Sequence, residues 1–196
     1  RSLPAVTPRR ARLPWLPGKI DTVTGMRRSG KTFFLYQRMA ELLRSGDPRE
    51  SVLYLNFEDE RFLPLRASDL HLIPETFYRL YPAMKRRQCA FFLDEVQNVE
   101  GWERFSRRLI DTERVHLCLT GSSARLLGRE IATSLRGRAI ETEIFPFSFE
   151  EALILDPEHE DALAGLGEVL LKFGQAEAGL RAFDRTIALG YDDDID

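Results

Sequence analysis

The chain has 196 residues, enough for one ordinary domain and a small second one. Hydrophobic residues make up 43% and charged residues 30%, which excludes a disordered, collagenous or disulfide-scaffold protein. No apolar run approaches the roughly 18–20 residues that cross a bilayer, so we expect no membrane span. The net charge of −3 lacks the basic excess of a dedicated nucleic-acid binder, which disfavours nucleic acid as a partner.

The first 18 residues predict an irregular N-terminal arm over 1–18, because they are rich in proline and basic side chains and contain no acid. The chain opens at Arg1 rather than Met, which indicates a trimmed chain or a fragment. Cys89 and Cys118 are too few for a disulfide framework and lie beside or within apolar runs. We therefore expect free buried thiols and, in the absence of a secretory segment, a cytoplasmic location.

Short apolar runs, partly β-branched, alternate with longer helical patterns. The runs expected to form strands are residues 20–24, 52–57, 90–94, 115–120 and 139–145. The third and fourth are almost continuously apolar, as in strands buried on both faces of a parallel sheet. Helical periodicity covers residues 32–45 and 102–111. The alternation predicts an α/β layered domain with right-handed crossovers.

The last forty residues have a different pattern, with two helical stripes separated by Gly174. The pattern predicts an αα-hairpin over 154–191, followed by an acidic tail over 192–196 that we expect to fray. The apolar stripes consist of Leu163, Leu166, Leu170 and Phe173, and of Ala176, Leu180, Phe183 and Ile187. Small residues are expected where the two helices touch, namely Gly165, Gly167, Ala178 and Gly179.

Residues 25–32 fit the phosphate-binding pattern G-x-x-x-x-G-K-[ST], and they lie between an expected strand and an expected helix. The glycines let backbone N–H groups turn toward phosphates at the start of the helix. Lys31 would reach the β- and γ-phosphates, and the Thr32 hydroxyl would ligate Mg²⁺. A glycine-containing turn with an incidental lysine is the alternative. The expected nucleotide-binding residues are Gly25, Met26, Arg27, Arg28, Ser29, Gly30, Lys31, Thr32 and Phe33.

The apolar strand 90–94 ends in two acids, Asp94 and Glu95. Carboxylates at the end of a buried strand are costly unless they have a use. Asp94 would hold the Mg²⁺ shell, and Glu95 would be the general base that activates water against the γ-phosphate. The alternative, an ordinary strand end with solvated acids, is disfavoured by the loop upstream.

Two later segments add candidate catalytic residues. Strand 115–120 leads into the hydroxyls of Thr120 and Ser122, which would sense the γ-phosphate or orient the water, or else form a turn that caps the next helix. Arg136 and Arg138 precede the last strand. An arginine given to a neighbouring subunit's γ-phosphate stabilises the transition state, and this role would require a homo-oligomer. A solvated surface pair is the alternative.

Six segments occur in an order typical of one family. They are GMRRSGKT (25–32), NFEDERF (56–62), FFLDEVQNVEGWERF (91–105), LTGSSARLL (119–127), SLRGR (134–138) and IFPFSFEEAL (144–153). Together they resemble the AAA-type P-loop ATPases of bacteria and archaea described as ATP-binding proteins. The resemblance implies an ATPase domain over 19–153, built as a three-layer αβα sandwich with a parallel five-stranded sheet in the order 5-1-4-3-2. It also implies positioning or packing roles for Gln97, Asn98 and Trp102.

After residue 153 the chain departs from that family, which continues into a helical lid. Residues 156–191 instead resemble a single tetratricopeptide repeat. One such repeat cannot bury its own faces, so we expect it to pack on the ATPase domain or to belong to a longer array. A protein partner would bind through this hairpin.

Two principal functions remain open. The first is Mg²⁺-dependent ATP binding and hydrolysis to ADP and phosphate, by a domain that acts as a motor or switch on an unknown partner. The second is a nucleotide-gated interaction scaffold with little or no hydrolysis. A small-molecule kinase is disfavoured, because two acids at a strand end suit water as the acceptor. No guanine-reading [NT]-K-x-D pattern occurs in the sequence, so the expected nucleotide is ATP.

Overall fold

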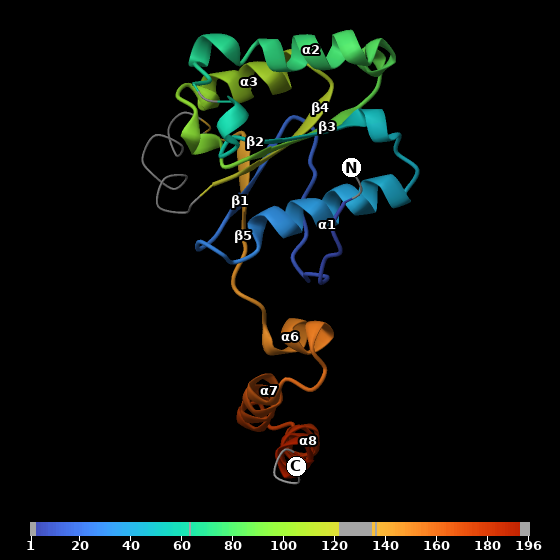
Figure 1. Cartoon of the computed structure of the whole chain (residues 1–196), viewed down its shortest axis with the longest axis vertical. Coiled ribbons are helices and arrows are strands. Elements are labelled where there is room, and N and C mark those ends of the chain that lie inside the picture. The colour runs from blue at the N-terminus through green and yellow to red at the C-terminus, as the bar shows by residue number, and fades with distance from the viewer. Residues whose placement is uncertain (1–2, 63, 122–134, 136, 193–196) are drawn as a thin grey trace. The chain divides into compact units, whose positions relative to one another are not determined.

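The computed structural model describes residues 3–62, 64–121, 135 and 137–192. Its contacts divide the chain into two compact units. The first comprises Arg1–Val6 and Ala11–Phe145 and has α/β architecture, and the second comprises Thr7–Arg10 and Pro146–Asp196 and is helical (Figure 1).

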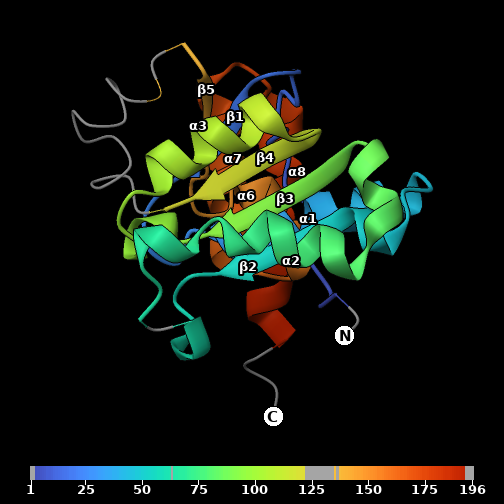
Figure 2. The same cartoon turned by 90° about the horizontal axis from the view of Figure 1, so that it is seen from above.

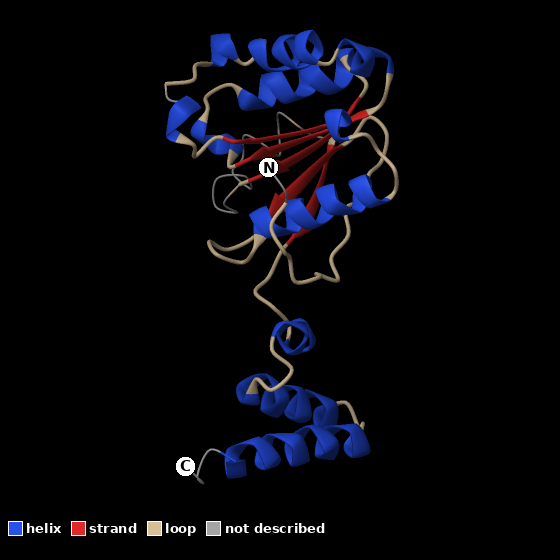
Figure 3. Ribbon diagram, turned by 45° about the vertical axis from the view of Figure 1, so that its right-hand side comes forward, coloured by secondary structure: helices blue, strands red, loops and turns tan. Residues whose placement is uncertain are grey.

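Within the described residues, the strands form one parallel five-stranded sheet (Figure 3). The strand order is β2-β3-β4-β1-β5. This is the order 5-1-4-3-2, so that prediction is confirmed. The strands are β1 (Ile20–Thr24), β2 (Val52–Asn56), β3 (Cys89–Asp94), β4 (Val115–Thr120) and β5 (Ala139–Glu143). The predicted bounds of β1 and β4 are confirmed, whereas β2 and β5 end earlier than predicted and β3 begins earlier.

Helices cover both faces of the sheet. Helix α1 (Lys31–Arg44) lies on one face, and α2 (Leu72–Leu80) and α3 (Trp102–Thr112) lie on the other (Figures 1 and 2). The predicted three-layer αβα sandwich is therefore confirmed. The connections contain short 3₁₀ helices at Arg49–Ser51, Glu60–Phe62, Ala67–Asp69, Pro82–Arg86 and Val96–Asn98.

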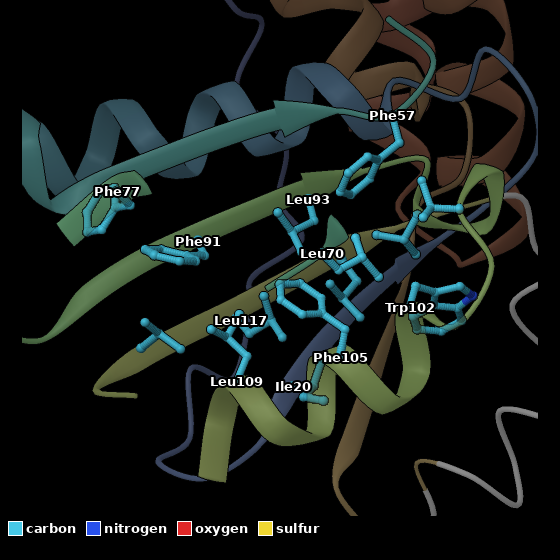
Figure 4. Packing of buried hydrophobic residues seen from close by; sticks show 14 of the residues in the cluster. Ile20, Phe57, Leu70, Phe77, Phe91, Leu93, Trp102, Phe105, Leu109 and Leu117 are labelled. Atoms are coloured by element: carbon cyan, nitrogen blue, oxygen red, sulfur yellow. The ribbon is translucent and has the colours of Figure 1, made fainter. Parts of the chain in front are cut away.

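The central strands send alternate side chains into two separate cores. Phe91 and Leu93 of β3 join a cluster on the α2 and α3 side, which includes Phe77, Phe105 and Leu109 (Figure 4). Ala90 and Phe92, which alternate with them along β3, pack on the α1 side. The cluster there also includes Val23, Phe34, Leu35, Met39, Cys118 and others. Each large side chain buried in this way contributes roughly 1.5–3 kcal/mol. Since both faces are covered, polar groups are concentrated at the strand ends.

Most of the N-terminal arm, apart from residues 7–10, packs on the α1 side of the sheet. Residues 3–18 contain no helix or strand, yet Leu13 is buried in the α1-side cluster. The Trp15 ring stacks on His116 with a centroid distance of 4.9 Å and lies 5.8 Å from Phe92. The arm is thus irregular in backbone but ordered by aromatic contacts.

Both cysteines are free and buried, as expected.

The helical unit consists of α6 (Phe149–Leu155), α7 (Glu160–Lys172) and α8 (Ala176–Asp192), and α7 and α8 form the predicted hairpin. A Cβ atom on Gly167 would lie 2.9 Å from the Phe183 ring, and one on Gly179 would lie 3.0 Å from the Gly167 carbonyl oxygen. Gly167 and Gly179 therefore allow the close helix contact, as the sequence predicted. The prediction is wrong for Gly165, because a Cβ atom there would meet the Phe149 ring of α6. None of the described helices is long and apolar enough to cross a membrane.

The apolar stripes of the hairpin are only partly buried. Leu163 is 4% exposed, whereas Phe173, Leu180 and Ile187 are 81%, 57% and 58% exposed. These three side chains are exposed because the facing helix covers mainly the glycine side of α7 and α8.

Residues 7–10 belong to the helical unit through a buried carboxylate on α6. Glu151 forms an ion pair of 3.2 Å with Arg9, and both side chains are more than nine-tenths buried. Glu151 also accepts a 2.9 Å hydrogen bond from the Arg10 backbone N–H and closes a capping box with Ser148. Helix α6 begins at this cap and groups with the hairpin, so the predicted domain boundary at 153/154 stays a prediction.

Asp21, the second residue of β1, is a buried acid. Its side chain is 2% exposed, and no hydrogen-bond partner for its Oδ1 atom lies among the described residues. Burial raises the pKa of Asp21 from 3.8 to about 6, although the Trp15 backbone N–H and the Arg38 charge act in the opposite direction. Because the folded-state pKa exceeds the unfolded value, stability falls as the pH rises from about 4 to about 6 and then levels off.

We predict that Asp21→Asn raises the free energy of unfolding at pH 8 by up to about 3 kcal/mol, and by roughly half as much at pH 5. Urea unfolding followed by tryptophan fluorescence measures this, because Trp15 and Trp102 both lie in the α/β unit. The exposed Asp47→Asn is the control and should change little at either pH. A gain for Asp21→Asn that is equal at the two pH values would contradict the account.

Candidate functional site

The loop between β1 and α1 has a backbone that its sequence requires. Gly25, Arg28 and Gly30 adopt positive φ angles of 144°, 65° and 94°. A Cβ atom on Gly25 would lie only 2.1 Å from the carbonyl oxygen of Ile144, which follows β5. Glycine is therefore needed here for conformation and for close approach of two backbone segments. The loop is a tight turn at the carboxyl edge of the sheet.

Lys31 places a positive charge inside this loop. Its side chain is 6% exposed, and its Nζ atom donates to the carbonyl oxygens of Gly25 and Met26 at 3.1 Å each. The ion pairs of the described residues do not include Lys31. Neutral carbonyl oxygens do not cancel the ammonium charge, so the loop attracts an anion.

The start of α1 adds to the same positive potential. Gly30 is the N-cap and provides no side-chain cap, and the first turn contains no acidic residue. The first backbone N–H groups of a helix have no intrahelical partner, and the helix dipole makes this end positive. Phe33, by contrast, is 54% exposed, and its ring lies edge-on to Tyr36 at 5.8 Å. Its predicted contribution is therefore through its backbone N–H.

Asp94, at the end of β3, is fully buried and accepts hydrogen bonds from three hydroxyl groups. Thr32 and Tyr54 each donate to Oδ2 at 2.8 Å, and Thr120 donates to Oδ1. Burial and the nearby negative charge of Asp94 raise the pKa of Tyr54, which keeps its hydroxyl a proton donor. The three donors stabilise a charged carboxylate in a buried position.

Glu95 follows Asp94 and is linked to it through Thr120. The Glu95 backbone N–H donates to the Thr120 hydroxyl oxygen at 3.0 Å, and that hydroxyl donates its own proton to Asp94. Glu95 has a φ of 54°, and its carboxylate accepts a hydrogen bond from Gln97. This geometry turns the Glu95 side chain away from the path of the strand and fixes its orientation.

The structure brings together most of the predicted site residues. Lys31, Thr32, Asp94, Glu95 and Thr120 lie at one edge of the sheet, where β1, β3 and β4 end. In the loop, Ser29 is buried, whereas Met26, Arg27 and Arg28 are exposed. Ser122 and Arg136 lie outside the described residues.

Arg138 lies at the opposite edge. Its carbonyl oxygen accepts a hydrogen bond from the backbone N–H of Ile20, the first residue of β1. The loop between β1 and α1, by contrast, follows the last residue of β1. The length of β1, about 16 Å at the usual rise per residue, therefore separates Arg138 from the loop. Its guanidinium forms a 2.6 Å ion pair with Asp111. A role of Arg138 toward a neighbouring subunit stays a prediction.

Sequence reasoning missed one residue of this site, Tyr54. It lies in the middle of β2, in a run that reads as an ordinary strand, VLYLN. Its hydroxyl reaches Asp94 because β2 pairs with β3, and no sequence motif marks that contact.

The α/β fold and the loop at its edge together define a P-loop protein. A glycine-bounded turn, a buried lysine and a helix start can bind phosphates, while Thr32 and Asp94 present the oxygen donors that Mg²⁺ prefers. The profile of a protein family described as an AAA domain matches residues 17–153, which is well over half of the chain. The chain therefore belongs to this AAA-domain family.

Two curated proteins are similar to this chain. An uncharacterized protein of Methanocaldococcus jannaschii, MJ1544, is 40% identical over 138 residues, which cover 70% of this chain and 29% of that protein. An uncharacterized protein of Haemophilus influenzae is 36% identical over 134 residues, covering 68% of this chain and 33% of that protein. The chain thus spans about a third of the length of the curated relatives that it matches.

Solved structures show more distant likeness. Cdc6p from Pyrobaculum aerophilum has a TM-score of 0.46 at 17% identity, covering 78% of this chain and 50% of that chain. A DNA polymerase III gamma subunit-related protein from Thermotoga maritima has a TM-score of 0.47 at 13% identity, covering 87% and 53%.

We predict that Gly25→Ala destabilises the α/β unit by more than Gly18→Ala. Both glycines have positive φ, which costs alanine about 1–2 kcal/mol, but only Gly25 would also place its Cβ against a backbone oxygen. Among the described residues, no atom lies within 4 Å of the corresponding position on Gly18. Urea unfolding of the two variants measures the difference, and equal losses would contradict the proposed close contact with Ile144.

Proposed function

We propose that the α/β unit binds ATP together with Mg²⁺ and hydrolyses it to ADP and phosphate. The buried Lys31 ammonium, held by loop carbonyls and by no carboxylate among the described residues, is the observation that carries the proposal. A triphosphate would supply the negative charge that this loop lacks. Membership of the AAA-domain family supports the same function.

Thr32 and Asp94 fit a magnesium site. The Thr32 hydroxyl gives its proton to Asp94, which leaves its oxygen lone pairs free to face a cation beside the loop. Asp94 contributes a fixed negative charge one hydrogen bond further away. When bound, Mg²⁺ would neutralise negative charge on the phosphates. The two residues hold and orient that ion.

Glu95 fits the role of general base. Its carboxylate follows directly on Asp94 and is held by Gln97, so it can accept a proton from a water molecule aligned with the γ-phosphate. Thr120 keeps the two acids in a fixed relation, since it donates to Asp94 and accepts from the Glu95 backbone. A catalytic contribution of Thr120 would therefore act through the positions of both acids.

We further propose that this domain acts as a motor or switch on a protein partner. An arginine from a second copy, with Arg138 as a candidate, would complete the site in a homo-oligomer. The hairpin α7–α8 would contact the partner.

A nucleotide-gated scaffold is the second candidate function. The exposure of Phe173, Leu180 and Ile187 on the hairpin favours it, because apolar groups grouped on one helical element mark protein contacts. The tetratricopeptide likeness of residues 156–191 belongs to this candidate. Nucleotide binding without phosphate release from the wild-type protein would favour the scaffold over the ATPase.

We predict that Lys31→Ala weakens binding of a fluorescent ATP analogue by roughly 10- to 100-fold, because a charged hydrogen-bond donor to the phosphates is lost. Fluorescence titration in the presence of Mg²⁺ measures the dissociation constant. Lys172→Ala, an exposed position in the last turn of α7, is the matched control and should bind as the wild type does. Equal weakening in both variants, or none in either, would contradict a phosphate site in the loop.

For hydrolysis, we predict that Glu95→Gln lowers phosphate release by about 10²- to 10⁴-fold while ATP still binds. Glutamine keeps the size and the hydrogen-bonding reach of the side chain but cannot accept the proton. Phosphate release is measured in the same samples as binding. Unchanged turnover would remove Glu95 from the mechanism.

A further inference from the structure

Among the hydroxyl donors to Asp94 in the described part of the chain, Tyr54 alone lies outside the loop, its helix and the neighbouring strand β4. It lies on β2, which forms one edge of the sheet, and its phenol oxygen is 2.8 Å from Asp94 Oδ2. The other donor to this oxygen, Thr32, is equally close. A carboxylate oxygen has two lone pairs, so Thr32 and Tyr54 together saturate Oδ2.

The position of Tyr54 is itself fixed from α1. The Tyr36 hydroxyl donates to the Tyr54 oxygen at 3.3 Å, and the two ring centroids are 5.3 Å apart. Tyr36 lies one helical turn after Thr32 and therefore on the same face of α1. The helix that begins at the phosphate loop thus orients both donors to Oδ2, one directly and one through Tyr36.

The three hydroxyls prevent rotation of the Asp94 carboxylate. Thr120 holds Oδ1, while Thr32 and Tyr54 hold Oδ2 from two sides. If the Tyr54 hydroxyl were lost, one lone pair of Oδ2 would have no donor. It would then compete with the other lone pair for the Thr32 proton or accept a hydrogen bond from water. Tyr36, Tyr54 and Asn56 line a surface cleft of about 720 Å³ beside β2, from which water would enter the space that the hydroxyl leaves. The carboxylate would then have a less defined orientation.

We propose that Tyr54 is a positioning residue of the magnesium site, which orients Asp94 so that Asp94 holds the Thr32 hydroxyl with its oxygen facing the cation. The inference rests on the proposed function of the loop. Residues that hydrogen-bond to metal ligands in this way typically change metal affinity 10- to 100-fold when mutated. Tyr54 would act through Asp94 and touch neither nucleotide nor metal.

The test is Tyr54→Phe, which keeps the ring and removes only the hydroxyl. Binding of Mn²⁺ to the complex of the protein with ADP is followed by electron paramagnetic resonance, and ADP binding without metal is followed by calorimetry. We expect the Mn²⁺ dissociation constant to rise roughly 10-fold while metal-free ADP binding stays within about twofold. A purely structural role would change both or neither. The melting temperature confirms that the variant is folded.

Tyr78→Phe is the matched control, since it removes a half-buried hydroxyl on α2, on the other face of the sheet, and should leave Mn²⁺ affinity unchanged. If the wild type binds Mn²⁺ with ADP and Tyr54→Phe binds it equally well, the role of Tyr54 is overturned and the proposed function stands. If the wild-type protein binds neither ADP nor Mn²⁺ with ADP, the proposed function itself is overturned.

Discussion

A buried carboxylate, Asp94, is the group around which the site is arranged. A charge in this position is costly unless several donors stabilise it, and three hydroxyls from three different elements do so. Thr32 comes from α1, Tyr54 from β2 and Thr120 from β4, so the carboxylate fixes these elements relative to β3. The same hydrogen bonds leave the oxygen of Thr32 available to a cation and orient the backbone of Glu95. Stabilisation of one charge therefore defines the geometry of the whole site.

The parallel sheet is what allows such convergence. Both faces of β3 and β4 are covered by helices, so polar side chains are tolerated chiefly where strands end. In a parallel sheet these ends share one edge, and the loop after β1 lies at that edge. Gly25 brings the loop against the backbone just beyond β5, the strand that pairs with β1. Buried Lys31 then supplies a positive charge inside this loop.

The motif residues could be predicted from sequence because their chemistry is local. The spacing of Gly25, Lys31 and Thr32 and the two acids after β3 need no knowledge of tertiary contacts, and the sheet order followed from resemblance to a family. Helix α2 was missed because it is short and contains Pro74, which is tolerated only in the first turn. Tyr54 was missed because its role depends on strand pairing, which leaves no sequence signal. The exposed apolar residues of the hairpin could not be predicted for a similar reason. Apolar periodicity indicates a helix but does not show which element covers its apolar face.

The most direct test of this account is a crystal structure of the protein with Mg²⁺ and a non-hydrolysable ATP analogue. The account predicts the triphosphate inside the loop at residues 25–31, with Mg²⁺ about 2.0–2.1 Å from the Thr32 hydroxyl oxygen. Asp94 should still accept hydrogen bonds from Tyr54 and Thr120 in that complex. A triphosphate bound elsewhere would contradict the account. A metal ion on the far side of the loop, without contact to Thr32 and Asp94, would contradict it as well.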